Sequence, residues 1–371
     1  MSVFLGLMSG TSLDGIDGVA VSWPDDNAPA MQVRGHVHHP FDVPLRERLL
    51  SLNQPQADEL EAAATAALAV ARGYAGVIDE LLVGSRLART DVRAVGAHGQ
   101  TVRHCPEAAG GGFTIQLLDG ATLAERCGID VVCDLRSRDL AAGGQGAPLV
   151  PAFHADRFGA VGEARAVLNL GGIANLTLLH ADGRVGGFDT GPANVLLDAW
   201  SAEQRGMPFD DLGRWAATGR VDAALLQRLL SEPYFQRSPP KSTGRDLFQL
   251  PWLKAHLAAL GHTPAPADVQ ATLAELTARS VVGALQRHLP DARGLWVCGG
   301  GALNAQLLSR LSGLLPAWRV QTTDALGLPP SQVEAVAFAW LAREFIARRP
   351  GNRPDVTGAK GPRLLGCLYP A

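Results

Sequence analysis

The chain has 371 residues, of which 47% are hydrophobic and 19% are charged, a composition that excludes a disordered protein and predicts two folded domains. Its 33 basic and 36 acidic residues leave a net charge of -3, which excludes a broad nucleic-acid-binding surface. The 42 glycines and 24 prolines exceed the usual share for a chain of this length and predict several tight turns.

The N-terminal part of the chain predicts strands alternating with helices. Three strands come first, and a turn rich in Gly and Asp over Gly10–Asp17 joins the first two. Apolar residues at helical spacing then predict a long helix from Ala57 to about Gly84. The expected strands are Val3–Met8, Val19–Trp23, Met31–Phe41, Val92–Ala97, Phe113–Leu118 and Ile129–Cys133, with a short helix at Ala121–Cys127.

The second half opens on the same pattern after the glycine-rich stretch Ala141–Pro151. Asp182-Gly183 is a strong hairpin signal between two of its strands. The expected strands are Ala166–Leu170, Asn175–His180, Val185–Phe188 and Leu295–Cys298, and the expected helices are Asn194–Arg205, Val221–Leu230, Ala267–His288, one from Asn304, and Ser331–Arg348.

This repeated order of elements predicts an α/β fold of two related domains with a cleft between them. We expect the first domain over residues 1–140 and the second over residues 141–348. The C-terminal segment, from about residue 349 to residue 371, is expected to pack back on the first domain.

The cysteines and the N-terminus indicate where the protein works. Five cysteines without a C-x-x-C pair disfavour a disulfide framework or a structural zinc and favour reduced thiols. The N-terminus lacks the basic segment of a signal peptide, and no apolar run reaches the roughly 18 residues of a membrane span. We therefore expect a cytoplasmic protein without membrane contact.

The turn after the first strand, Gly10–Asp17, has the composition of a phosphate-binding loop. Its backbone N–H groups and the hydroxyls of Thr11 and Ser12 can hold phosphate oxygens. Asp14 and Asp17 would repel phosphate unless a cation such as Mg²⁺ lies between them. No lysine follows the glycines, so the loop is not a Walker A motif, and an ordinary hairpin turn is the alternative.

Two further glycine-bearing turns, Asn169–Asn175 and Phe188–Asn194, are brought to one end of a sheet by the intervening hairpin. Two adjacent loops of this kind can clamp a ligand. Asp189 ends an apolar strand, where a partly desolvated carboxylate is poised to act as a general base. The alternative is that Asp189 caps the helix that begins at Asn194.

Polar side chains just after strands are weaker candidates for a binding site. His98 and Thr101 can bind sugar hydroxyls, unless His98 is structural. Arg136 or Arg138 can grip a carboxylate, unless they form surface ion pairs. The cluster Lys241–Asp246 fits either a phosphate-facing loop or a solvated linker.

Two further segments lie at helix starts. The glycine loop Cys298–Asn304 can lie against a flat ligand or a phosphate, or it can serve strand–helix packing alone. Ser331 and Glu334 have the spacing of a capping box, which accounts for both residues, and a cleft-facing Glu334 is the alternative.

Seven segments together resemble the anhydro-N-acetylmuramic acid kinase family, and they occur in the family's order between Gly6 and Asn304. They are GLMSGTSLDGID (Gly6–Asp17), GAHGQTV (Gly96–Val102), AAGGQGAPLVP (Ala141–Pro151), NLGGIAN (Asn169–Asn175), FDTGPAN (Phe188–Asn194), KSTGRDLF (Lys241–Phe248) and CGGGALN (Cys298–Asn304).

The resemblance implies the fold of the sugar kinase, Hsp70 and actin superfamily, which has two ribonuclease-H-like domains around a nucleotide and sugar cleft. It implies ATP and Mg²⁺ as cofactors and a role in the recycling of peptidoglycan sugars. In the implied reaction, water attacks C1 of 1,6-anhydro-N-acetylmuramic acid and the C1–O6 bond breaks. O6 takes the γ-phosphoryl group of ATP, giving N-acetylmuramic acid 6-phosphate and ADP.

Carried onto this sequence, the resemblance assigns Asp189 as the catalytic base. Asp14 is the expected Mg²⁺ ligand, directly or through water. The lactyl carboxylate of such a sugar needs a cation, for which we prefer Arg136 to Arg138, with Lys241 or Arg245 as the next candidates. The expected ATP-binding residues are Gly10, Thr11, Ser12, Leu13, Asp14, Gly15, Ile16, Asp17, Gly171, Gly172, Asn175, Gly299, Gly300 and Gly301, and the expected sugar-binding residues are His98, Thr101, Arg136, Asn194 and Glu334.

We expect a small-molecule substrate and no nucleic-acid or membrane partner, and we leave open whether the chain forms a homodimer. Two other functions stay open. An ordinary hexose or amino-sugar kinase would use Asp189 to deprotonate a sugar hydroxyl, so that no solvent oxygen enters the product at C1. A non-enzymatic, actin-like nucleotide-binding protein would share the fold, although the sugar-facing motifs count against it.

Overall fold

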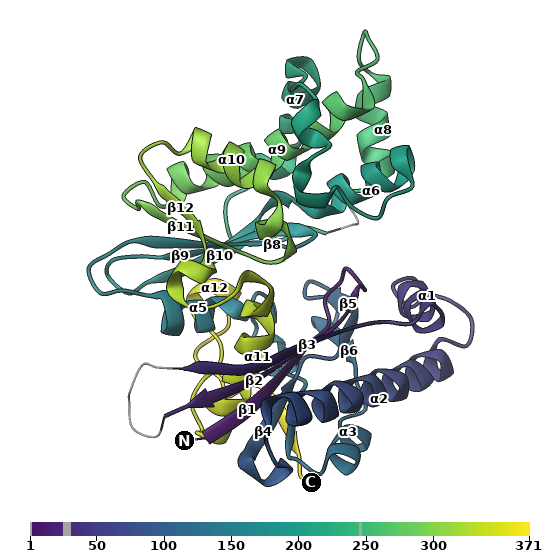
Figure 1. The fold of residues 1–371 in the computed structure, drawn as a ribbon, viewed down its shortest axis with the longest axis vertical. Coiled ribbons are helices and arrows are strands. Elements are labelled where there is room, and N and C mark those ends of the chain that lie inside the picture. Colours follow the sequence, from purple (N-terminus) through teal and green to yellow (C-terminus); the bar gives the residue numbers. More distant parts are fainter. Residues whose placement is uncertain (1, 25–30, 245–246) are drawn as a thin grey trace. The chain divides into compact units, whose positions relative to one another are not determined.

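The computed structural model describes residues 2–24, 31–244 and 247–371, so Arg245 and Asp246 lie outside the described residues. The chain divides into two compact units (Figure 1). The first comprises Met1–Phe153 together with Gln332–Ala371, and the second comprises His154–Ser331.

The first unit is built on a six-stranded sheet in the order β13-β7-β4-β1-β2-β3. Strands β1, β2 and β3 are antiparallel neighbours, whereas β4 runs parallel to both β1 and β7. The bounds are β1 Ser2–Met8, β2 Gly15–Trp23, β3 Gln32–Pro40, β4 Val92–Ala97, β7 Val131–Cys133 and β13 Cys367–Tyr369, and a separate two-stranded sheet pairs β5 Gln100–Cys105 with β6 Phe113–Leu117.

Two helices, α2 (Glu59–Ser85) and α11 (Val333–Ile346), cover opposite faces of this sheet. Side chains alternate along β1, so Leu7 faces α2 and Gly6 faces α11. A Cβ on Gly6 would overlap the carbonyl oxygen of Ala335, so only glycine lets α11 lie directly on the strand. The first turn of α11 is thereby held against β1.

The C-terminal chain returns to the first unit. Strand β13 pairs with β7, and the buried Asp139 carboxylate accepts hydrogen bonds from Asn352 (2.7 Å) and Thr357 (2.8 Å). The expected boundaries at residues 140 and 348 differ from the observed division at Phe153 and Ser331. The C-terminal boundary differs because α11 is apolar around most of its circumference and is buried against β1 and β4 of the first unit. The remaining helices of this unit are α1 Val43–Ser51, α3 Gly120–Cys127, α4 Ser137–Ala141 and α12 Pro354–Thr357, and α5 Val150–Phe158 crosses the division.

The second unit repeats the arrangement. Its sheet has the order β10-β9-β8-β11-β12, with β8, β9 and β10 antiparallel and β11 parallel to β8 and β12. This is the order of β3-β2-β1-β4-β7 in the first unit, so the expected α/β fold of two related halves is confirmed. The bounds are β8 Arg165–Leu170, β9 Ile173–Leu179, β10 Val185–Pro192, β11 Gly294–Cys298 and β12 Arg319–Thr322.

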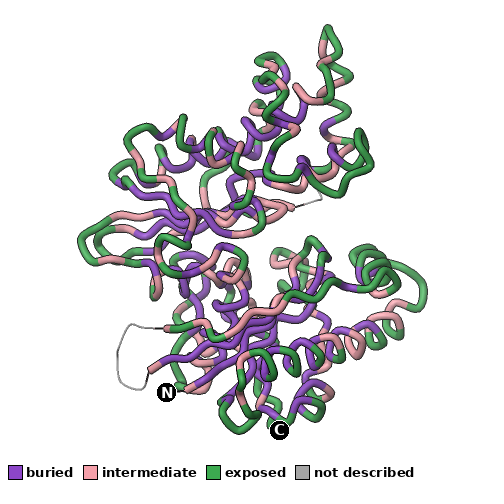
Figure 2. The backbone as a smooth tube through the Cα atoms, viewed as in Figure 1, coloured by how far each residue is buried: buried purple, intermediate pink, exposed green. Residues whose placement is uncertain are grey.

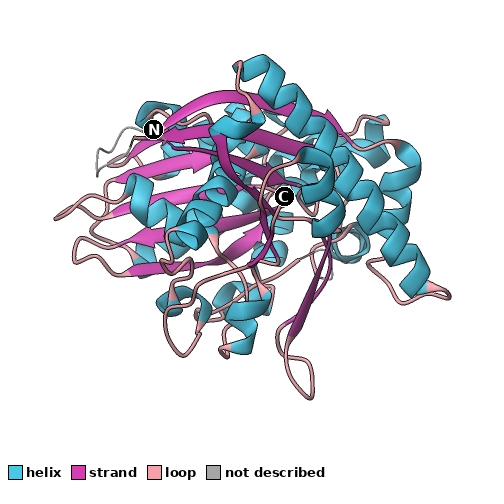
Figure 3. Ribbon diagram, turned by 90° about the horizontal axis from the view of Figure 1, so that it is seen from below, coloured by secondary structure: helices cyan, strands magenta, loops and turns pink. Residues whose placement is uncertain are grey.

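Helices pack on the sheet of the second unit and form a second core among themselves. Figure 3 distinguishes the helices from the strands, and Figure 2 shows that the central strands are buried. Among the described residues, no helix combines the length and the apolar character needed to cross a membrane. The helices of this unit are α6 Asn194–Arg205, α7 Ala223–Leu230, α8 Leu250–Ala258, α9 Pro266–His288 and α10 Ala305–Leu314.

Candidate functional site

In the first unit, the parallel strands β1, β4 and β7 end at one edge of the sheet and place three predicted segments there: the loop after Met8, His98 and Arg136. The ring Nδ1 of His98 donates to the carbonyl of Ser9 (3.1 Å), and its Nε2 accepts from Nη2 and Nε of Arg136 (2.9 and 3.2 Å). Burial, reinforced by the Arg136 charge, lowers the pKa of His98 to about 3. His98 is therefore a neutral imidazole in a fixed tautomer.

Glu334 joins this cluster from the first turn of α11. The predicted capping box is wrong, because a 3-10 turn at Pro330–Gln332 precedes the helix and makes Gln332 the N-cap residue, without a side-chain cap. Ser331 is exposed instead. Burial raises the pKa of Glu334 to about 7; the Arg136 charge opposes this rise, and the carboxylates of Asp17 and Asp14 add to it. A carboxyl group that titrates near neutral pH thus lies beside the predicted phosphate loop.

The loop after β1 divides into an exposed part and a structural part. Thr11, Ser12 and Asp14 are exposed, and the hydroxyl of Ser12 donates to Asp14 Oδ1 (2.8 Å). Leu13 adopts a positive φ of 58° and its side chain is buried. Gly10 is partly exposed, and its carbonyl accepts from Gln100 Nε2 (3.1 Å).

The second part of the predicted loop belongs to β2. A Cβ on Gly15 would overlap the backbone of His39 on β3, and Ile16 is buried in the core. The carboxylate of Asp17 accepts from His36 (3.2 Å) and His38 (3.0 Å). The exposed groups that remain free for a ligand therefore belong to Gly10–Asp14, which is narrower than predicted.

Thr101 makes a different contact from the rest of the predicted sugar site. It lies on β5, where its hydroxyl accepts from Gln116 of β6 (3.2 Å). Arg138 is exposed on the short helix α4, whereas Arg136 is half-buried. Arg136 also donates from Nη1 to the carbonyl of Gly146 (2.9 Å).

In the second unit, Asp189 lies near the end of β10 with only 9% of its surface exposed. It does not cap α6, whose N-cap is Ala193. Its Oδ1 accepts from Asn175 of β9, and its Oδ2 accepts from the backbone N–H of Thr243 (3.0 Å). Burial raises the pKa of Asp189 to about 6 in spite of these two donors and the charge of Lys241.

The sequence did not identify the groups that hold Asp189 in place. The carbonyl of Asp189 accepts from the hydroxyl of Tyr234 (2.8 Å), and its N–H donates to the carbonyl of Lys241 (3.2 Å). Lys241 and Thr243 belong to the polar cluster whose role the sequence left undecided. Asn175, which we expect among the ATP-binding residues, contacts Asp189.

The glycine turns of the second unit are neighbours, as predicted. The carbonyls of Gly171 and Gly172 accept from backbone N–H groups at the start of α6 (2.9–3.1 Å). Asn194 donates to the carbonyl of Leu170 (3.2 Å), and a Cβ on Gly301 would come within 3.0 Å of Asn194 Oδ1. The loop at 299–301 thus lies against Asn169 and Leu170, just before the turn at 171–172, and Asn194 contacts both loops.

A comparison with known protein families bears on what these sites do. The family model described as "Anhydro-N-acetylmuramic acid kinase" matches residues 2–371. The chain belongs to this family. Among its relatives, the anhydro-N-acetylmuramic acid kinase of Bordetella petrii is 57% identical over 371 residues, which is 100% of this chain and 96% of the relative. That of Paraburkholderia xenovorans is 54% identical over 376 residues, covering 99% and 98%.

Solved structures with little sequence identity share the fold. The activator of the 2-hydroxyisocaproyl-CoA dehydratase from Clostridium difficile, solved with bound ADPNP, superposes with a TM-score of 0.50 at 13% identity, covering 93% of this chain and 96% of that one. Component A of the (R)-2-hydroxyglutaryl-CoA dehydratase from Acidaminococcus fermentans gives the same TM-score and identity over 91% and 96%. The likeness supports the predicted fold class for this member of the kinase family.

Proposed function

We propose that the chain is an ATP-dependent kinase that opens 1,6-anhydro-N-acetylmuramic acid and phosphorylates O6. The products are N-acetylmuramic acid 6-phosphate and ADP, in the recycling of peptidoglycan sugars. The observation that carries the proposal is Asp189, a buried carboxylate of raised pKa in a chain that belongs to this family over its whole length. The five cysteines are reduced thiols, which suits a reaction in the cytoplasm.

Asp189 would act as the general base. Water forms a bond to C1, its proton passes to Asp189, and the C1–O6 bond breaks. O6 in turn bonds to the γ-phosphorus as the bond to the β-phosphate oxygen breaks, so no separate acid is needed for O6. A pKa of about 6 leaves the carboxylate ionised at neutral pH, and it is a stronger base there than an ordinary aspartate.

The glycine loops leave room for the phosphates and the nucleoside of ATP, which supplies the phosphoryl group when bound. An added Cβ on Gly300 would meet nothing within 4 Å, and one on Gly10 would meet only Ser12, with the hydroxyl at 3.3 Å. Asn169 and Leu170, which precede the turn at Gly171–Gly172, lie against the 299–301 loop. We infer that Gly10–Asp14 and Gly171–Gly172 hold the phosphates and that 299–301 lies against adenosine.

The donor set fits Mg²⁺ through Asp14. Among the described residues, no group of three or more His, Cys, Asp or Glu side chains forms a metal centre. Mg²⁺ in kinases needs only one or two carboxylates, because phosphates and waters complete its shell. Asp14 is exposed, whereas Asp17 is already bonded to two histidines, so we assign Asp14 as the ligand, directly or through water.

Arg136 and Glu334 would bind the sugar, and His98, whose two ring nitrogens are used on Ser9 and Arg136, would hold Arg136 in position. Three of the five guanidinium N–H donors of Arg136 are used on His98 and Gly146, which leaves two for the lactyl carboxylate. Glu334, with a pKa of about 7, can donate to or accept from a sugar hydroxyl at neutral pH. Thr101 and Asn194 stay as proposed sugar contacts on the family resemblance alone.

The decisive experiment is turnover in ¹⁸O-labelled water with ATP and the anhydro sugar, followed by mass analysis of the product. The proposal predicts a phosphorylated product that carries one labelled oxygen at C1. A phosphorylated product without label would identify an ordinary sugar kinase. Absence of any phosphorylated sugar, with ATP bound, would leave the non-enzymatic alternative.

A further inference from the structure

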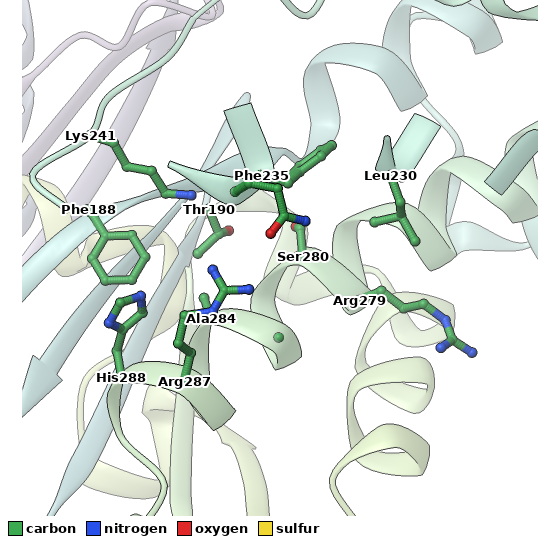
Figure 4. A pocket seen from close by; sticks show the side chains of 12 residues that line it. Phe188, Thr190, Leu230, Phe235, Lys241, Arg279, Ser280, Ala284, Arg287 and His288 are labelled. Carbon is green, nitrogen blue, oxygen red and sulfur yellow. The ribbon is translucent and has the colours of Figure 1, made fainter. Parts of the chain in front are cut away.

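A cavity of about 210 Å³ lies in the second unit between β10, the 3-10 turn Pro233–Gln236 and α9 (Figure 4). Its wall includes Phe188 and Thr190, which precede and follow Asp189 along β10. Because side chains alternate along a strand, Phe188 faces away from the side that carries the Asp189 carboxylate, and Asp189 is not among the residues that line the cavity. The cavity is therefore distinct from the site of the proposed base.

Basic side chains from two segments converge on this cavity. Lys241 and Arg287 point into the same space, whereas Arg279 points away (Figure 4), and its Nε donates to Glu275 (2.7 Å). His288 also lines the cavity, with its ring edge-on to Phe188 at 5.1 Å. The described residues that line the cavity include no Asp or Glu.

Lys241 is the most unusual of these groups, because only 8% of it is exposed. Its ammonium donates to the carbonyl of Tyr234 (3.3 Å) and lies 4.7 Å from the centre of the Tyr234 ring. An ammonium has three N–H donors, and this contact uses one. Burial lowers the pKa of Lys241, the charges of Arg287 and Arg237 lower it further, and the charge of Asp189 opposes the fall. Asp189 interacts with Lys241 from outside the cavity, and the described residues of the cavity wall add two cations and no carboxylate.

We propose that this cavity binds a phosphate-type oxyanion, either inorganic phosphate or the phosphoryl group of a phosphomonoester, between Lys241 and Arg287. The hydroxyls of Thr190 and Ser280 already donate to backbone carbonyls (3.3 and 2.9 Å), so the donors left for a ligand are on nitrogen. Two cations match the nearly two negative charges of a phosphate group at neutral pH. Charge-assisted N–H···O bonds are the strong class of hydrogen bond for such an anion.

The site adjoins the segment that holds Asp189. The carbonyl of Lys241 accepts from the N–H of Asp189, and the N–H of Thr243 donates to Asp189 Oδ2. An anion bound to the Lys241 side chain therefore contacts the segment whose backbone positions the proposed base. This consequence for turnover rests on the proposed function, whereas the binding of the anion does not.

The test is calorimetric titration of the full chain with inorganic phosphate at a saturating concentration of a non-hydrolysable ATP analogue, whose three phosphates keep free phosphate out of the proposed nucleotide loops. We expect saturable binding by the wild type. Arg287→Gln and Lys241→Met should each weaken it at least about tenfold, the effect of losing one charge-assisted bond. Arg279→Gln, on the rim of the same cavity, is the matched control and should bind like the wild type.

No saturable binding at millimolar phosphate, or equal affinity in the wild type and Arg287→Gln, overturns the proposal. Arg287 is exposed, so this variant folds even if Lys241→Met does not, and urea unfolding checks both. A second titration with glucose 6-phosphate distinguishes the two sources. Binding that depends on Arg287 in the same way assigns the site to phosphomonoesters as well, and binding of inorganic phosphate alone assigns it to the free ion.

Discussion

Replacing Asp189 with asparagine separates two roles of this carboxylate, a buried charge in the fold and the proposed base. Burial raises its pKa from 3.8 to about 6. Because the folded-state pKa lies above the unfolded one, the protonated form favours folding. That contribution is full below about pH 3.8 and is lost as the pH rises to about 6, which amounts to roughly 3 kcal/mol.

Asp189→Asn removes this pH dependence of stability but leaves two N–H donors with one acceptor oxygen. Both carboxylate oxygens accept from N–H groups, of Asn175 and Thr243, whereas an amide offers only one oxygen. One buried donor left without a partner costs about 1–3 kcal/mol. The loss of the buried charge offsets this cost at neutral pH. Between pH 4.5 and 7.5, the stability of the variant relative to the wild type should therefore rise by about 2 kcal/mol.

Urea unfolding of both proteins at several pH values measures this difference, and ADP release with ATP and the anhydro sugar measures turnover. We expect turnover to fall at least about 100-fold in the variant, the lower end for loss of a general base. Wild-type turnover should decline as the pH falls through about 6, where Asp189 takes up a proton. If the free energies of unfolding of the two proteins changed in parallel with pH, Asp189 would not be a buried charge of raised pKa. Near-normal turnover in a folded variant would show that Asp189 is not the general base.

Three further predictions concern the first unit. Gly10→Val should fold, because an added Cβ meets only Ser12, with Oγ at 3.3 Å. In a nucleotide titration it should bind ATP more weakly than the wild type, while the anhydro sugar still binds. Unchanged ATP affinity would mean that the loop has a structural role only. Arg136→Ala should reduce, by about ten- to a hundred-fold, the ratio of kcat/KM for the lactyl-bearing anhydro sugar to kcat/KM for its counterpart without the lactyl group. Arg138→Ala, at an exposed position, should leave this ratio nearly unchanged. An unchanged ratio in Arg136→Ala would show that another residue binds the carboxylate. Asp139→Asn should lower the free energy of unfolding by about 1–3 kcal/mol, because both carboxylate oxygens accept buried hydrogen bonds. A loss of only about 0.5 kcal/mol, as for a surface substitution, would contradict the role of Asp139 in holding the C-terminal segment.

Much of the candidate site could be predicted because it follows strands along the chain. Gly10 and His98 lie just beyond the ends of strands with a clear apolar pattern, Asp189 lies near the end of another, and the hairpin at Asp182-Gly183 determines which turns meet. The weaker elements escaped prediction. Strand β13 is three residues long and exposed, and helix α8 begins at a proline-containing stretch beside the polar Lys241 cluster, so neither has a distinct apolar period.

The sequence by itself determined the α/β class, the repeated order of elements and the family, because local periodicity and contiguous motifs carry that information. Only the tertiary structure decided that α11 belongs to the first unit, that Glu334 faces Arg136 instead of capping a helix, and that Thr243 holds Asp189. Each of these depends on a contact between residues far apart in the chain. Such contacts set the burial that raises the pKa of Glu334 and Asp189, and no local pattern of residues encodes it.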